Sequence, residues 1–462
     1  MKSAPMSKKA SAAASELLSE RELRRIADTV LRLAKSTAAE ETEVHVDEVA
    51  NALTRFANNA IHQNVAEHGL TVSIRTVING RTARATSNRI DEDSLRAAIE
   101  ASLSLAHSQP KIPSLLPMPG KQRYRRVNRF IKQTAALSAE ERARAVRRAC
   151  DLAVKKGQVA AGIFSNGQSQ SALANSRGLF AAYRETHAEF SITMQEDSAA
   201  SWAKANSSDV RAFDPQKLAA RAGEKAHLAV NARELAPGRY TVILEPSAVL
   251  DLVGFLFYDF AATALADKRS CLNERMGKQL FGPNISITDD VYHPLQQGAP
   301  FDGEGVPRHR VGLVDHGVPK NLVYSRAAAK AAHKQPTGHG FPLPNEYGEA
   351  PMNLVFGGGD SSVEKMVAST DRGLLVTRLW YIREVDPYEK VMTGMTRDGL
   401  FLVENGRVSA ARNFRFNQSL IEMLKNVELL GPAVRATGEE AFEMVVPAMK
   451  VRNFHFSEVT KF

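Results

Sequence analysis

The chain up to about residue 232 contains the same order of predicted elements twice, and this duplication constrains the fold more than any other feature. The first copy has a helix over about 16–35, the alternating segments TEVHVDEVAN and LTVSIRTVINGRTARATSN, and a closing helix from Asp91. The second copy has a helix over 138–157, the segments VAAGIFSNGQSQSALANS and GLFAAYRETHAEFSITMQED, and a closing helix over 214–232. This repeated pattern predicts an α+β domain with internal duplication.

Short local signals refine this prediction. Ser138 followed by Glu141 forms a capping box at a helix start, and Gly157 ends the same helix. Asn-Gly and Asp-Gly pairs favour two-residue hairpin turns. Such turns are predicted at Asn79-Gly80, Asn166-Gly167, Asp398-Gly399 and Asn405-Gly406.

The character of the chain changes after residue 235. A strand over 240–245 leads into an apolar stretch. Between Val249 and Ala264 the apolar residues recur at helical spacing, so we expect one helix with a buried face. Beyond it lie hairpin-like segments such as VGLVDHGVPKNLVYS and GLLVTRLWYIREV, a short helix in SLIEMLKNVELLG and a last strand in VVPAMKVRNFHFSEVT. The C-terminal part is therefore predicted to be β-rich and dominated by hairpins.

These patterns divide the chain into three parts. We expect a disordered tail over 1–14, an N-terminal α+β domain over 15–232 and a C-terminal β-rich domain over 236–462. Within the N-terminal domain, the two repeats cover about 15–107 and 136–232, and a Pro-rich and basic linker joins them.

Composition limits the environment of the protein. Cys150 and Cys271 are its only cysteines, too few for a disulfide framework or a Cys-rich zinc site, which fits a reducing compartment. The N-terminus MKSAPMSKKASAAASELLSE lacks the apolar run of a secretory signal. Asp251 and Asp259 interrupt the apolar stretch after residue 247, which argues against a membrane span. We therefore expect a cytoplasmic protein.

The formal net charge of +9 concentrates in KQRYRRVNRFIK (121–132) and RARAVRR (142–148). Basic residues that alternate with Tyr124 and Phe130 are compatible with a nucleic-acid groove. A solvated linker followed by the polar face of a helix explains the same pattern and is the favoured interpretation. Nucleic acid is therefore not expected as a partner.

Other chemistry-bearing residues give weak signals. A metal site was considered at His293, His309, His316 and His339, with Asp302 and Glu304 between them, but the spacings match no standard ligand pattern. FGGGDSS (356–362) lacks the Lys-Ser/Thr ending of a phosphate loop and is interpreted as a flexible loop near a peptide channel. Nucleophile motifs are absent around Ser165, Ser361 and Ser362. Trp380 and Tyr381 are expected on opposite faces of a strand, one in the core and one lining a groove.

Three long segments carry a resemblance to a known family. They are FDGEGVPRHRVGLVDHGVPKNLVYS, LLVTRLWYIREVDPYEKVMTGMTRDGLFLVENGRV and ARNFRFNQSLIEMLKNV. With them, the chain from about residue 20 resembles the TldD/PmbA family, which includes zinc peptidases once described as modulators of DNA gyrase. The resemblance implies a metallopeptidase fold and a role in proteolysis.

The resemblance also locates a candidate site. In the TldD branch, a helix carries a His-Glu-x-x-x-His motif whose histidines bind zinc and whose glutamate acts as general base, and a late cysteine is the third protein ligand. The corresponding positions here are Tyr258, Asp259 and Thr263, and no cysteine follows Cys271. Taken alone, Tyr258 and Asp259 lie off the apolar stripe and are interpreted as a rim residue and a solvated carboxylate. We therefore expect no intact catalytic set, metal site or cofactor site in this chain.

A similar loss of the motif characterises the PmbA branch, also called TldE-like. The resemblance then implies a subunit of a metallopeptidase assembly that acts on unfolded peptides, with zinc and peptidase activity on a TldD-like partner. The chain is expected to dimerise with that partner or with itself. Two alternatives stay open: a self-sufficient hydrolase with a non-standard site, and a nucleic-acid-associated binding protein.

Overall fold

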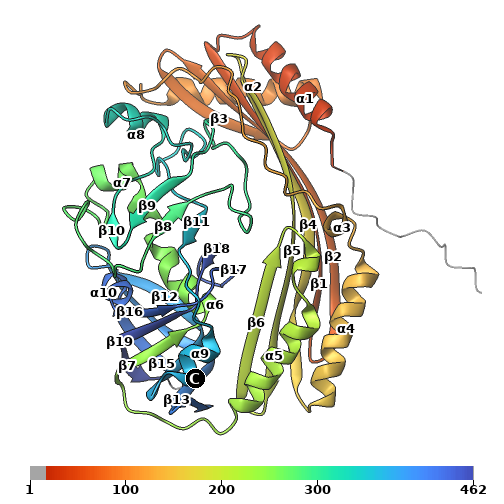
Figure 1. Ribbon diagram of the computed structural model, residues 1–462. Helices are drawn as coiled ribbons and strands as arrows, with labels where there is room; N and C mark the ends of the chain where they lie inside the picture. Colours follow the sequence, from red (N-terminus) through yellow and green to blue (C-terminus); the bar gives the residue numbers. More distant parts are fainter. Residues whose placement is uncertain (1–16, 461–462) are drawn as a thin grey trace, which may run out of the picture.

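The computed structural model describes residues 17–460, so the predicted tail over 1–14 lies outside the described residues. Figure 1 shows a long curved sheet with its helices on one side of the molecule and a β-rich body on the other. The predicted α+β fold, with a helix-and-strand N-terminal half and a β-rich C-terminal half, is confirmed. No helix within 17–460 is long and apolar enough to cross a membrane.

The N-terminal half forms one six-stranded antiparallel sheet in the order β3-β2-β1-β4-β5-β6. The first sequence copy supplies three strands, and the second copy supplies the other three. Their bounds are β1 Glu41–Ala57, β2 Ala60–Ile78, β3 Arg81–Ser87, β4 Val159–Asn175, β5 Phe180–Glu196 and β6 Ala199–Ser207. Since β1 pairs with β4, the two copies share a single sheet instead of forming separate ones.

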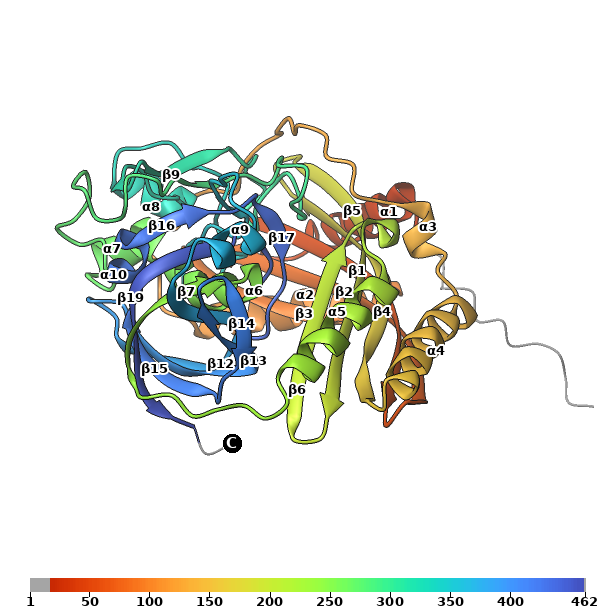
Figure 2. The ribbon, with the colours of Figure 1, turned by 60° about the horizontal axis from the view of Figure 1, so that its bottom comes forward.

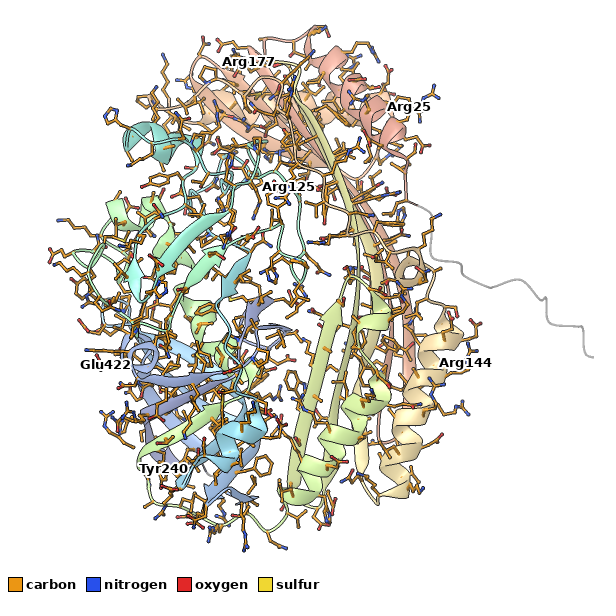
Figure 3. The ribbon with its side chains drawn as sticks, in the orientation of Figure 1. Arg25, Arg125, Arg144, Arg177, Tyr240 and Glu422 are labelled. Carbon is orange, nitrogen blue, oxygen red and sulfur yellow. The ribbon has the colours of Figure 1, made fainter. Side chains whose placement is uncertain are left out.

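Helices from both copies cover one face of this sheet. The helices and helical turns of this half are α1 Glu20–Ala34, α2 Glu92–Ser108, α3 Lys132–Ala135, α4 Ala139–Lys155, the 3₁₀ turn η1 Val210–Ala212 and α5 Pro215–Leu228. One apolar cluster joins α1 and α2 to the sheet and a second joins α4 and α5 to it. Charged residues such as Arg25 and Arg144 point away from the sheet into solvent (Figure 3).

The local signals at the ends of these elements have mixed outcomes. The capping box of Ser138 and Glu141 forms as predicted. The turns at Asn79-Gly80 and Asn405-Gly406 also form, with all four residues at positive φ. The first turn joins β2 to β3, and the second joins β13 (Val391–Glu404) to β14 (Arg407–Ala410).

The turn predicted at Asn166-Gly167 is wrong, because both residues lie inside β4 between β1 and β5. The Asn166 side chain is buried and accepts a hydrogen bond from Arg142 at 2.6 Å. Pairing on both sides and this buried contact outweigh the local preference for a turn.

The turn predicted at Asp398-Gly399 is also wrong. Both residues belong to β13 and have positive φ, 52° and 129°. They lie where the register with β12 (Arg372–Asp386) shifts, so the Asp-Gly pair serves a β-bulge.

The C-terminal half contains two sheets, one in the order β10-β9-β8-β11-β18-β17 and one in the order β12-β7-β19-β15-β13-β14, with β16 paired to β19. The remaining strands are β7 Gly238–Leu244, β8 Ile287–Asp289, β9 Val311–Asp315, β10 Val318–Pro319, β11 Leu354–Phe356, β15 Phe414–Ser419, β16 Val427–Leu430, β17 Val434–Ala436, β18 Met444–Val446 and β19 Met449–Val459. The predicted hairpin in VGLVDHGVPKNLVYS is β9–β10, and the predicted short helix is α10 Leu420–Lys425. Two further short helices are α8 Arg326–Ala331 and α9 Val363–Ala368.

The single helix predicted from Val249 to Ala264 is wrong. The segment is divided into α6 Pro246–Val253, the 3₁₀ helix η2 Gly254–Phe260 and α7 Ala262–Ala266. Ala261 is extended, and the N–H of Ala262 donates to Val323 O at 3.1 Å. This tertiary hydrogen bond takes the chain out of the helix although the apolar spacing continues.

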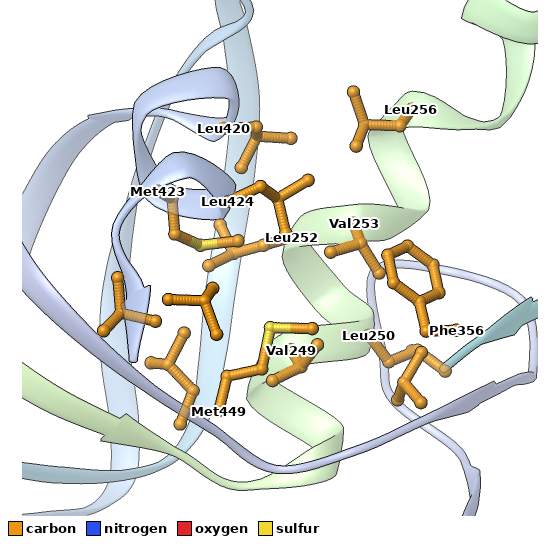
Figure 4. Close-up of a cluster of buried hydrophobic side chains, with 14 of the residues drawn as sticks. Val249, Leu250, Leu252, Val253, Leu256, Phe356, Leu420, Met423, Leu424 and Met449 are labelled. Carbon is orange, nitrogen blue, oxygen red and sulfur yellow. The ribbon is translucent and has the colours of Figure 1, made fainter. Parts of the chain in front are cut away.

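The α6 helix is buried on all sides instead of on one face. Figure 4 shows its apolar residues among side chains from α10, β11 and β19. Val249, Leu252 and Val253 have no exposed surface. Fully burying an aliphatic side chain contributes about 1.5–3 kcal/mol, so this segment is central to the C-terminal core.

The two halves of the chain meet along β6, which faces the C-terminal half in Figure 2. Trp202 of β6 lies 4.7 Å from the guanidinium of Arg378, which also contacts Trp380. Asn206 of β6 donates to Glu443 at 2.8 Å. These contacts fix the segment between β17 and β18 against the N-terminal sheet.

Candidate functional site

The candidate site is a pocket of about 470 Å³ in the C-terminal half. Its lining includes two of the three motif positions, Tyr258 and Asp259, both on η2. The remaining lining comes from other residues of η2, Arg269 after α7, the end of β12, the turn before β13 and the segment between β17 and β18. The pocket therefore assembles parts of the chain that are far apart in sequence.

Asp259 forms the polar floor of this pocket. Its side chain is only 2% exposed and forms an ion pair with the ammonium of Lys390. The N–H of Cys271 donates to Asp259 Oδ1 at 2.7 Å. The interpretation of Asp259 as a solvated carboxylate is therefore wrong, because a lysine from a distant turn covers it.

Lys390 joins Asp259 to a second carboxylate. Its ammonium lies 2.8 Å from Glu384 Oε1, and its backbone has a φ of 52°, in the left-handed region that non-glycine residues seldom adopt. Burial alone would lower the pKa of the Lys390 ammonium, but Asp259 and Glu384 raise it above its ordinary value. The lysine is thus a fixed positive charge between two carboxylates.

Cys271 lies next to this ion cluster and has no exposed surface. Burial, followed by the neighbouring Asp259 carboxylate, raises the pKa of the Cys271 thiol far above its ordinary value. The sulfur is therefore a neutral thiol at physiological pH and not a thiolate.

The third motif position is separated from the other two. Thr263 belongs to α7, where its N–H donates to Glu349 Oε1 at 2.7 Å and its hydroxyl donates to Glu349 Oε2 at 3.2 Å. Tyr258 lies at the pocket rim, and its hydroxyl donates to the carbonyl of Tyr347 at 3.1 Å. The break at Ala261 therefore directs Thr263 toward a different partner from Asp259.

This arrangement does not fit the zinc ion of a metallopeptidase. The three motif positions provide no imidazole and no thiolate, and their only carboxylate is already paired with Lys390. Within residues 17–460, no group of three His, Cys, Asp or Glu side chains is arranged to hold a metal ion. The geometry therefore supports no step of metal-assisted hydrolysis in this chain.

The segment 437–443, between β17 and β18, forms another wall of the pocket, and we call it the strap. Asp251 of α6 accepts hydrogen bonds from the N–H groups of Glu439 and Glu440 at 3.2 Å each. Burial raises the pKa of Asp251 to about 7. Lys204 of β6 donates to Gly438 O at 3.3 Å, so the strap connects the pocket to the N-terminal sheet.

The histidines of the C-terminal half do not form a cluster. His339 is buried and bonds Asp289 at 2.8 Å, whereas His316 is exposed beside Asp315. Asp302 and Glu304 are buried and accept backbone hydrogen bonds, Asp302 from Gly340 at 2.7 Å. His293 and His309 are partly exposed and lie in loops. These residues stabilise loops in the structure.

The glycine-rich segment FGGGDSS is bound to its surroundings along its length. The N–H of Gly359 donates to Gly431 O at 2.8 Å, and that of Ser361 donates to Leu430 O at 3.1 Å. Ser362 caps α9. These bonds join its backbone to the segment of Leu430 and Gly431, and its flexibility remains a prediction. Ser165 lies inside β4 opposite Glu189 and has no catalytic partner there.

Trp380 and Tyr381 do not alternate as predicted, because a bulge interrupts β12 after Trp380. Trp380 is half-buried over the guanidinium of Arg397 at 4.9 Å. Tyr381 is 57% exposed with a φ of 56°, and its N–H donates to Glu440 on the strap. Neither ring belongs to the core.

The basic linker packs against both halves of the chain. Tyr124 donates to Gly305 O at 2.8 Å, and Phe130 lies under the guanidinium of Arg184. Arg125 is placed between the long sheet and the C-terminal loops (Figure 3), where it stacks on Tyr292. The aromatic rings are therefore engaged within the protein and do not form a stacking surface for bases.

Sequence reasoning missed the residues that complete the pocket. Lys390 and Glu384 flank the turn from β12 to β13, and Glu439 and Glu440 lie on the strap. The only local trace of Lys390 is its place in the tight turn DPYEKV, and nothing in that pattern points to Asp259. The pairing depends on the tertiary arrangement of distant segments.

The fold and the divided site define a member of a metallopeptidase family. Three sequence models of PmbA/TldA metallopeptidase domains match this chain, domain 1 over residues 43–106, the central domain over 131–230 and the C-terminal domain over 237–458. The chain therefore belongs to the TldD/PmbA family, and the predicted resemblance is confirmed.

Solved structures share this fold over nearly the whole chain. TldE from Thermococcus kodakarensis is 20% identical, with a TM-score of 0.85 over 94% of this chain and 100% of that one. A Thermotoga maritima protein, named as a proposed modulator of a DNA gyrase, is also 20% identical, with a TM-score of 0.83 over the same shares.

A curated relative, a protein named a metalloprotease from Methanothermobacter thermautotrophicus, is 24% identical over 237 residues, which are 48% of this chain and 49% of that protein. The matched region thus spans about half the length of this relative.

Proposed function

We propose that this chain is a TldE/PmbA-like subunit of a TldD/PmbA-type metallopeptidase assembly and that peptide bonds are cleaved at zinc held by a TldD-like partner. The observation that carries this proposal is the ion pair between Lys390 and Asp259. A general base must have a free carboxylate near the reacting water, and here a lysine covers that carboxylate. In this proposal, Tyr258, Asp259 and Thr263 make contacts within the protein and do not bind a metal ion.

In this proposal, the chain shapes a channel for unfolded peptides. Extended peptides bind proteins by adding a strand to an open sheet edge. The long N-terminal sheet ends in β3 and β6, and one of the C-terminal sheets ends in β17 beside the strap. An unfolded substrate that pairs with the β17 edge would be held next to the strap, which forms one wall of the pocket.

The partner is expected to be the zinc-bearing TldD-like chain, with a homodimer as the state formed in its absence. Contact through the C-terminal half would cover the hairpin edges of its sheets. Stable interfaces of this kind bury on the order of 2,000 Å² or more in total. A cytoplasmic location remains a prediction.

The test combines sedimentation with peptidase assays of the chain alone, a TldD-like partner alone and their mixture. We expect a heterodimer, cleavage of unfolded peptides only in the mixture, and zinc that copurifies with the partner. A partner that is fully active by itself, together with monomers in every sample, would contradict the subunit role.

The two alternatives give different results. A self-sufficient hydrolase would cleave peptides without a partner. A nucleic-acid-binding protein would bind DNA with an affinity that falls steeply as salt rises, because phosphate contacts release counterions.

A further inference from the structure

One wall of the pocket is aromatic. The ring centroid of Phe257 lies 5.3 Å from that of Phe442 and 6.2 Å from that of Tyr258. Ring faces attract a cation placed within about 6 Å of the centroid. The chain itself shows this, because the guanidinium of Arg269 lies 5.6 Å from the Tyr258 ring.

The polar part of the pocket carries excess negative charge. On the floor, two carboxylates, Asp259 and Glu384, share the single ammonium of Lys390. On the strap, the one ion-pair partner of Glu439 within residues 17–460 is Lys204 at 3.6 Å, and the same lysine also pairs with Glu189.

The excess persists when every partner is included. The charged lining residues, their ion-pair partners and Glu189, the second partner of Lys204, comprise six carboxylates and four cations, a formal excess of two negative charges. They are Asp259, Glu384, Glu439, Glu440, Glu189 and Asp267 against Lys390, Lys204, Arg383 and Arg269.

We propose that this pocket binds one cationic side chain, arginine or lysine, of a peptide. The aromatic wall suits the flat face of a guanidinium or the alkyl stem of a lysine, and the carboxylates suit its charge. A volume of about 470 Å³ is within the usual range for ligand pockets, about 300–1,000 Å³. The inference rests on the proposed function only in that a peptide is the ligand.

The first test compares three blocked pentapeptides on the isolated full chain by titration calorimetry. Each has alanine at four positions and arginine, citrulline or glutamate at the centre. Citrulline has nearly the shape of arginine but no charge. We expect the arginine peptide to bind at least ten-fold more tightly than the citrulline peptide and the glutamate peptide to show no binding. Equal affinity for arginine and citrulline, or no binding of the arginine peptide, would overturn the proposal.

The second test uses two variants with a matched control. Glu439→Gln removes a rim charge, and Phe442→Ala removes part of the aromatic wall. Glu428→Gln is the control, since Glu428 is 29% exposed, close to the 33% of Glu439, and lies outside the pocket lining. We expect each pocket variant to weaken the arginine peptide about five-fold or more and the control to leave its affinity within two-fold. Unchanged affinity in both pocket variants would overturn the proposal.

These results separate this inference from the subunit role. Arginine-selective binding in a chain that never associates with a TldD-like partner would leave the pocket assignment intact and refute the subunit role. An active heterodimer whose isolated subunit binds the arginine and citrulline peptides equally would support the subunit role and refute the pocket assignment.

Discussion

Replacing Lys390 with Met is the most direct test of the ion cluster beneath the pocket. Methionine keeps the length and the apolar stem of lysine but removes the ammonium. Asp259, 2% exposed, then has no positive partner, whereas Glu384, 33% exposed, regains water. Removing one partner of a buried ion pair costs about 3–5 kcal/mol, because a charge is left buried without compensation. We expect the free energy of unfolding of Lys390→Met to fall by about that amount.

Urea denaturation followed by tryptophan fluorescence measures this change, since the chain has two tryptophans. Lys425→Met is the control, because Lys425 pairs with Glu422 at 3.7 Å on the surface and exposed pairs contribute about 0–1 kcal/mol. The double variant Asp259→Asn with Lys390→Met should recover at least half of the loss. Two results would refute the argument that Lys390 compensates a buried charge on Asp259. One is a fall of less than about 1 kcal/mol in the free energy of unfolding of Lys390→Met, and the other is a double variant no more stable than Lys390→Met.

The cluster also sets a pH dependence. The raised pKa of Lys390 means that its ion pairs contribute full stability below the ordinary lysine pKa of 10.5 and lose it as pH rises through the higher folded value. The stability difference between wild type and Lys390→Met should therefore shrink as pH rises above about 10.5.

Three further outcomes are expected. Because burial raises the pKa of Asp251 from 3.8 to about 7, only the folded state keeps the proton between these two values, so the free energy of unfolding falls as pH rises through that window. Wild type should therefore lose roughly 2–3 kcal/mol more than Asp251→Asn between pH 5 and 8 in urea titrations, and parallel curves would contradict this. Gly162→Ala should lower the free energy of unfolding by about 1–3 kcal/mol, because an added Cβ would lie 2.1 Å from Ser191 O. The control is Gly69→Ala in the same sheet, whose Cβ would make only ordinary contacts. Equal stability of the two variants would refute the steric argument. Zinc analysis of the untagged chain should give far less than one ion per molecule, and a tightly held stoichiometric zinc would overturn our interpretation of the motif positions.

Much of the fold was predictable because its signals are local. Period-two alternation, two caps and a duplicated order of elements are all written within short windows, and they led to the α+β class. The failures share one cause. At Asn166, a turn-forming pair lies inside β4 because strands on both sides supply the pairing, and at Asp398 such a pair forms a bulge where the register of β12 and β13 shifts. At Ala261, a bond between Ala262 and Val323 divides a segment whose spacing is helical throughout.

The site was predictable only in part for the same reason. The family resemblance led to Tyr258 and Asp259, and both line the pocket. Asp259 is covered by Lys390, which lies in the turn between β12 and β13, far from Asp259 in the sequence. No local sequence pattern therefore distinguishes a solvated carboxylate from a covered one. The strap was unpredictable too, because its anchor to Asp251 joins α6 to the segment after β17.

The buried acid at position 259 needs an explanation beyond stability. A buried ion pair often stabilises a fold no more than apolar residues of similar volume would. The pair has a geometric role here: Asp259 accepts a hydrogen bond from the backbone of Cys271, and Lys390, whose own backbone is left-handed at the end of the turn between β12 and β13, pairs with Asp259 and Glu384. Together they fix η2 and Glu384 around one cavity. The pair thus fixes the shape and the acidity of the pocket floor, the two properties on which the proposed binding of a cationic side chain depends.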